Sequence, residues 1–79
     1  METTTVHIRL FATLGKFLPE GGERHVQIQP GATVSNLLSQ LSIPESDAKL
    51  IFINGRRANL ETVLKGGERL GIFPPVGGG

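Results

Sequence analysis

Apolar residues recur at every second position in two segments near the start of the chain. The period of two runs from Val6 to Leu10 and returns at Val26 and Ile28, with polar residues between. This alternation is typical of strands that bury one face. It predicts a first strand over residues 5–12 and a second strand that is joined to it as a hairpin by a glycine-containing turn.

The period changes in the middle of the chain. Four apolar residues from Val34 to Leu41 fall at positions i, i+3, i+4 and i+7, which is the spacing of one helix face. Thr33 is a favourable N-cap residue, and Pro44 follows as a stop signal. The pattern therefore predicts one amphipathic helix over about residues 34–42.

Strand patterns return after the helix. The segment over residues 49–53, which is apolar from Leu50 onward, ends at Asn54-Gly55, a pair that suits a two-residue hairpin turn because both residues tolerate positive φ. A third strand is thus expected to turn into a short fourth one. Leu70 and Ile72 then alternate with their neighbours and predict a last strand.

Strands on both sides of a single helix predict an α+β fold in the order ββαββ, with a mixed sheet and the helix packed across one face. We expect a ubiquitin-like β-grasp domain over residues 1–76 and a flexible glycine tail over residues 77–79. The expected core pairs sheet residues with helix residues: Ile8, Leu10, Val26, Ile28, Ile51, Ile53, Leu70 and Ile72 against Leu37, Leu38 and Leu41. Three further residues are expected to plug the open end of this core: Leu60, Val63 and Leu64.

Three of the four phenylalanines fall in the outward phase of their strands: Phe11, Phe52 and Phe73. Together they would form an aromatic patch on the open face of the sheet, facing solvent, of the kind that marks a partner surface. Two alternatives remain at this point. The phase can slip by one residue, or the segment that carries Leu14, Phe17 and Leu18 can fold over the patch.

Composition excludes several classes of function. The chain has 79 residues, a net charge of +1 and no cysteine. A small domain with one core fits this length, whereas disulfides, a thiolate nucleophile and cysteine-ligated metals are excluded. We expect no nucleic-acid partner because Arg56-Arg57 is the only adjacent basic pair, and no membrane segment. The expected location is the cytoplasm.

No arrangement of residues predicts catalysis or a bound cofactor. His7 and His25 lie in separate strand patterns without an acidic residue at metal-ligand spacing, so no metal site is expected. Paired carboxylates and Ser/His sets are missing, so the chain is expected to be non-catalytic when alone. The glycine pairs lack the lysine of a phosphate-binding loop and are interpreted as turns.

The carboxyl-terminal segment is the most informative motif. Phe73 is followed by Pro74, Pro75 and Val76, and then by three glycines that end the printed sequence. The proline pair removes two ladder donors and ends the strand. Glycine has the smallest cross-section, so this tail could enter a narrow slot and present its terminal carboxylate. A terminal glycine run can also be no more than a frayed end.

Together these features resemble the ubiquitin-like sulfur carriers, and most closely the small subunit of molybdopterin synthase. The resemblance covers nearly the whole chain, and its most specific part is the last segment. It is carried by four stretches: Ile8-Arg9-Leu10-Phe11-Ala12, Gly31-Ala32-Thr33-Val34 with Leu37-Leu38, Ile53-Asn54, and Phe73-Pro74-Pro75-Val76-Gly77-Gly78-Gly79.

The resemblance implies that the carboxylate of Gly79 is adenylated by a separate ubiquitin-activating-like enzyme, which uses ATP, and is then thiocarboxylated by a sulfur donor. Gly78 completes the double glycine. The thiocarboxylated tail would then enter the large subunit of molybdopterin synthase and give its sulfur to a pterin precursor. The expected partner-binding residues extend from the aromatic patch to the tail: Phe11, Phe52, Phe73, Pro74, Pro75, Val76 and Gly77.

Gly77 departs from the small polar residue often found before the double glycine, which could mark a different acceptor. Carriers for thiazole, cysteine or tungsten-cofactor synthesis share the same chemistry. A protein modifier joined to lysines and an interaction module with an inert tail also stay open. The sequence does not identify the sulfur acceptor, the sulfur donor, the stoichiometry of a complex, or any processing that exposes Gly79.

Overall fold

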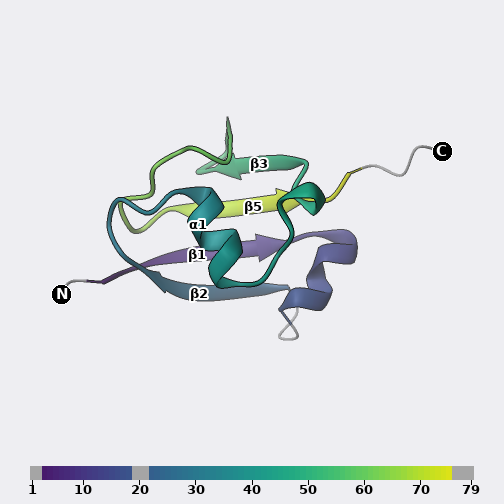
Figure 1. The fold of residues 1–79 in the computed structure, drawn as a ribbon, viewed down its shortest axis with the longest axis horizontal. Coiled ribbons are helices and arrows are strands. Elements are labelled where there is room, and N and C mark those ends of the chain that lie inside the picture. Colours follow the sequence, from purple (N-terminus) through teal and green to yellow (C-terminus); the bar gives the residue numbers. More distant parts are fainter. Residues whose placement is uncertain (1–2, 19–21, 76–79) are drawn as a thin grey trace.

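The computed structural model describes residues 3–18 and 22–75, which form a five-stranded sheet crossed by one α-helix (Figure 1). The elements in chain order are β1 Thr4–Leu10, 3-10 helix η1 Ala12–Phe17, β2 Glu23–Ile28, α1 Val34–Gln40, 3-10 helix η2 Glu45–Asp47, β3 Leu50–Ile53, β4 Arg56–Ala58 and β5 Arg69–Phe73. The predicted β-grasp is confirmed, and the predicted short fourth strand is present as β4, so that three strands follow α1 where the order ββαββ counted two.

The sheet has the order β2-β1-β5-β3-β4 and is mixed. β1 pairs with β2 in antiparallel and with β5 in parallel orientation, while β5 pairs with β3 in antiparallel orientation. The last strand therefore lies at the centre of the sheet. Since β1 and β5 run in the same direction, both end beside η1 (Figure 1).

The β3–β4 hairpin forms at the predicted turn. Asn54 and Gly55 have φ values of 52° and 83°. These left-handed values at both central residues match the twist of the flanking strands. The turn then returns the chain so that Ile53 pairs with Arg56.

α1 begins where the sequence predicts. The Thr33 side chain accepts a hydrogen bond from the Asn36 backbone N–H, and the Asn36 side chain accepts one from the Thr33 backbone N–H. The helix ends at Gln40, two residues before the predicted end. Ser42 has a φ of 60°, which is incompatible with a continuing right-handed helix.

The core lies between the sheet and α1. Most predicted members are buried, and Ile53 and Leu41 are only partly buried. Leu14 and Leu18 also enter the core from η1 and from the residue after it, so this part of the segment does not fold over the open face. The buried residues are Val6, Ile8, Leu10, Leu14, Leu18, Val26, Ile28, Val34, Leu37, Leu38, Ile43, Ala48, Ile51, Leu64, Leu70 and Ile72.

One predicted core residue is wrong. Val63 is 53% exposed, whereas Leu64 is fully buried and Leu60 packs partly against the core. Backbone hydrogen bonds tie this segment to the start of α1: Val63 bridges to Thr33, and the Leu64 N–H donates to the Ala32 carbonyl. Neighbouring side chains of an extended segment point in opposite directions, so Val63 and Leu64 cannot both face the core.

β1 ends two residues before the predicted boundary because Ala12 has a φ of 54°. Val76 and residues 77–79 lie outside the described residues, so the predicted boundary between domain and tail stays a prediction. None of the helices in the described ranges is both long and apolar enough to span a bilayer.

Candidate functional site

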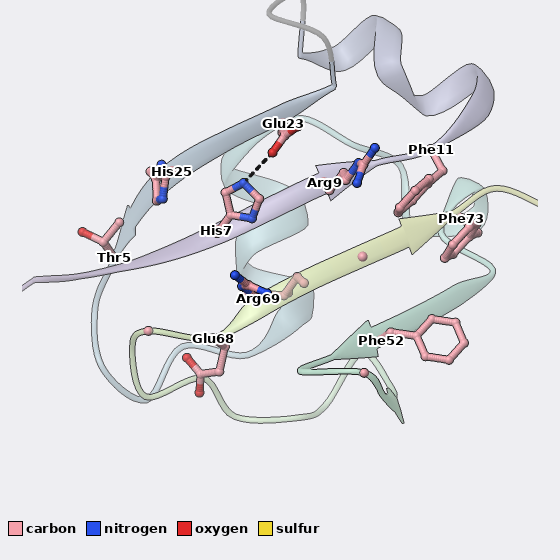
Figure 2. A pocket seen from close by; sticks show the side chains of 14 residues that line it. Thr5, His7, Arg9, Phe11, Glu23, His25, Phe52, Glu68, Arg69 and Phe73 are labelled. Carbon is pink, nitrogen blue, oxygen red and sulfur yellow. Dashed lines mark hydrogen bonds and ion pairs between the residues drawn. The ribbon is translucent and has the colours of Figure 1, made fainter.

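The aromatic cluster, which consists of Phe11, Phe52 and Phe73, lies on the open face of the sheet, opposite α1 (Figure 2). The rings of Phe11 and Phe73 are stacked, with centroids 4.2 Å apart and planes 4° from parallel. The Phe52 ring meets Phe73 edge to face at 5.8 Å. Both are favourable geometries for aromatic pairs. The predicted outward phase is confirmed, but each ring is half-buried by its neighbours and only partly faces solvent.

The register of the central strands explains this cluster. Leu70 and Ile72 of β5 face the core, so Phe73 faces the other side. The Phe11 N–H donates to the Ile72 carbonyl at 3.0 Å, which holds the residue after β1 beside β5. Phe52 faces outward from β3 because its neighbour Ile51 is buried.

Polar side chains cover the other end of the open face (Figure 2). His7 Nε2 lies 2.9 Å from Glu23 Oε1, and the ring centroids of His7 and His25 are 4.9 Å apart. The guanidinium of Arg9 lies 5.0 Å from the centre of the Phe11 ring and links the two ends by a cation–π contact.

The two histidines belong to separate strand patterns in the sequence, but the β1–β2 register places His7 directly opposite His25. The predicted hairpin could have revealed this contact, because two strands that pair across the glycine-containing turn bring these two positions together. Within the described ranges, no cluster of three or more His, Asp or Glu side chains is arranged to hold a metal ion.

The Glu68 side chain caps the turn at Gly66-Gly67. Glu68 accepts hydrogen bonds from the backbone N–H groups of Lys65 and Gly66 at 2.8 and 2.7 Å. Partial burial alone would raise the pKa of Glu68, but these backbone donors outweigh it and lower the pKa below its usual value. The turn's amide donors are thus already bonded to a carboxylate and do not form a phosphate cradle.

The centre of the open face is a shallow hollow of about 1000 Å³, walled by the aromatic cluster at one end and by polar side chains at the other (Figure 2). Gly71 of β5 lies at its floor, with Arg9 beside it on β1 and Phe52 on β3. The sequence pattern placed Gly71 in the outward phase, but it gave no sign that the position is hollow.

The path from the aromatic cluster to the tail is short. The Phe73 carbonyl accepts a hydrogen bond from the Lys49 N–H at 2.9 Å. Pro74 and Pro75 follow, half-buried and exposed, and supply no N–H donor. The remaining predicted site residues lie outside the described residues, so their roles stay predictions: Val76, Gly77, Gly78 and Gly79.

The fold and the open face define a ubiquitin-like β-grasp protein. Residues 8–79 match the ThiS family, and the chain belongs to this family. The resemblance to ubiquitin-like sulfur carriers is thereby confirmed. No curated protein sequence matches the chain.

Solved structures agree with this assignment. The HVO 2177 protein of Haloferax volcanii is 26% identical with a TM-score of 0.78, and the match covers 98% of this chain and 88% of that one. A putative molybdopterin converting factor, subunit 1, from Pyrococcus furiosus is 26% identical with a TM-score of 0.73, over 92% and 99% of the two chains. SAMP1, a small archaeal modifier protein from H. volcanii, is 26% identical with a TM-score of 0.71, over 95% and 99%.

Proposed function

We propose that this protein is a sulfur carrier for molybdopterin synthesis, with the terminal carboxylate of Gly79 as the group that is activated and thiocarboxylated. One observation carries the proposal. β5 is held at the centre of the sheet, and it leads from Phe73 of the aromatic cluster directly into the proline pair and the glycine tail. Membership of the ThiS family and similarity to a molybdopterin converting factor subunit support it.

Activation is needed because a carboxylate is a poor electrophile. The terminal carboxylate attacks the α-phosphate of ATP, pyrophosphate leaves, and a mixed anhydride with AMP results. A hydrosulfide equivalent from the sulfur donor then attacks the carbonyl carbon, and the bond to the AMP oxygen breaks. The carrier leaves with a thiocarboxylate. A separate activating enzyme supplies the ATP site, while this chain binds no cofactor and is itself the substrate.

The aromatic cluster is the surface by which partner enzymes hold the domain while the tail enters their active sites. Aromatic side chains at the centre of an interface carry much of its binding energy. From Pro75 to Gly79 the extended chain reaches roughly 16 to 18 Å. Such a length suits a buried active site approached from a docked domain. The partners are the activating enzyme, the sulfur donor and the large subunit of molybdopterin synthase, all in the cytoplasm.

Two alternatives keep the same activation step. A carrier for another sulfur pathway differs only in the acceptor, and the Phe73-Pro74-Pro75-Val76 segment favours molybdopterin synthesis over it. The similarity to SAMP1 favours a protein modifier, in which a lysine amine replaces sulfide as the nucleophile.

A reconstituted transfer reaction separates these functions. Thiocarboxylated protein is mixed with the large synthase subunit and the pterin precursor, and unmodified protein serves as the control. We expect formation of the dithiolene pterin and return of the carrier to its carboxylate form. Absence of transfer, together with isopeptide-linked Gly79 on lysines in cells, would instead identify a modifier.

A further inference from the structure

The backbone conformation at Gly71 does not require a glycine. It lies in the middle of β5, and its φ is outside the left-handed region that favours glycine. Glycine weakens a strand interior, and its presence there often marks a site where another group approaches closely. A Cβ at this position would meet one neighbouring atom, Cε2 of Phe11, at 3.3 Å. The absence of a side chain at Gly71 leaves room for the Phe11 ring and keeps the floor of the hollow low between Arg9 and Phe52.

The acidic and the basic side chains around this hollow differ in whether they have partners within the protein. Glu23 pairs with His7, and the Glu68 carboxylate is held by backbone N–H groups. Arg9 and Arg69 both line the hollow, and neither has an ion pair with any residue in the ranges 3–18 and 22–75. The acidic groups of the face are thus engaged within the protein, while two guanidinium groups remain available to a carboxylate.

We propose that the hollow above Gly71 receives one apolar side chain of the activating enzyme, and that an adjacent carboxylate of that enzyme binds Arg9 and Arg69. This inference rests on the proposed carrier function. The rings of the aromatic cluster form the apolar wall, and the guanidinium groups form the cationic side (Figure 2). Gly71 then determines specificity, because any side chain there occupies the space that the partner residue needs.

The charge of the face favours this occupant over a second copy of the chain. A two-fold dimer presents the same surface patch on both sides of the interface. A dimer axis at Gly71 would place Arg9 and Arg69 against the same residues of the second copy, and like charges facing each other oppose binding. A partner with an acidic surface segment has no such penalty.

The first test fills the hollow in steps. Gly71→Ala and Gly71→Val are compared with wild type in ATP–pyrophosphate exchange catalysed by the activating enzyme, with the carrier concentration varied. We expect KM for the carrier to rise a few-fold for alanine and ~10-fold or more for valine, because a central interface position is blocked, while kcat is retained. Gly15→Ala is the matched control, since a Cβ there meets nothing within 4 Å.

Thermal stability shows whether the variants fold. Alanine and valine suit a strand interior better than glycine, whereas an added Cβ would lie 3.3 Å from Cε2 of Phe11 and would require this stacked ring to move by a few tenths of an ångström. Both Gly71 variants are therefore expected to melt near the wild-type temperature. A loss of affinity without a loss of stability is the signature of a position reserved for a partner.

The second test reverses one charge. Arg69→Glu is expected to raise KM ~10-fold and to remove much of its dependence on salt, because steering between opposite charges is screened by ions. Arg56→Glu is the matched control. Arg56 pairs with Ile53, which packs against the core, so it lies away from the open face and its reversal should leave KM close to wild type.

The outcomes separate this inference from the carrier function. Absence of pyrophosphate exchange with wild-type protein and a competent activating enzyme would contradict the carrier function itself. Exchange with wild type and an unchanged KM for Gly71→Val would overturn the hollow as a binding site. A wild-type dimer in sedimentation experiments that Gly71→Val converts to a monomer would also overturn it, because the occupant would then be a second copy.

Discussion

The two faces of the sheet are built from the same strands but from different kinds of residue. The face beneath α1 consists of Val, Ile and Leu side chains, and the three buried residues of the helix are completely inaccessible. The open face carries half-buried aromatic rings, charged side chains and Gly71. The contrast indicates that one face stabilises the fold and that the other is available for recognition, since aromatic residues and arginine are enriched at interfaces.

The largest effect on stability should come from the core face. Leu38→Ala removes a fully buried side chain, and such changes cost about 2–5 kcal/mol because they also leave a cavity. Urea denaturation followed by circular dichroism measures the change. A cost close to zero would contradict the division between the two faces.

Phe52→Ala tests the open face, where a substitution should affect partner binding more than stability. The Phe52 ring contributes one edge-to-face contact with Phe73, so the expected loss of stability is about 1 kcal/mol. Affinity for the partner enzyme, measured by titration calorimetry, should fall ~10-fold or more. Equal affinity in a folded variant would remove the aromatic cluster from the interface.

Pro74→Gly tests the link between the cluster and the tail. Proline restricts the backbone before binding, so glycine raises the entropy that is lost when the tail becomes ordered. KM for thiocarboxylation should rise about two- to five-fold, which corresponds to roughly 0.4–1 kcal/mol. The melting temperature should stay near wild type. Unchanged thiocarboxylation kinetics would count against this role.

The smallest effect concerns Glu68. Its folded-state pKa is lowered, so its carboxylate stabilises the fold above the unfolded value of 4.5, and this contribution is lost as pH falls through the lowered pKa. Glu68→Gln should reduce stability at pH 7 and lose less of it toward pH 3 than wild type. Denaturation midpoints across this range measure both effects, with the exposed Glu61→Gln as control. Parallel pH profiles for Glu68→Gln and wild type would show that the Glu68 carboxylate does not stabilise the turn.

Local patterns predicted most of the fold. Alternation located the strands, the helical spacing located α1, and Asn54-Gly55 located the β3–β4 turn. These signals depend on neighbouring residues and are visible in sequence. The error at Val63 arose because backbone bonds to residues near α1 set the phase of that segment, and such long-range contacts leave no local pattern.

The candidate site was predicted less completely. The outward phase of Phe11 and Phe73 could be predicted, but their stacking depends on the parallel pairing of β1 with β5, which lie far apart in the sequence. The same pairing places Arg9 beside Gly71 and so creates the hollow. Pairing between distant strands is set by the whole sheet and is not encoded in either segment alone.

The intact mass of the protein shows whether its terminal carboxylate becomes a thiocarboxylate. The protein is incubated with ATP, a competent activating enzyme and a sulfide source, beside a variant that lacks Gly78 and Gly79. We expect a mass gain that corresponds to one oxygen replaced by sulfur, and no gain in the variant. Neither adenylate nor thiocarboxylate on the wild-type protein would contradict the carrier function.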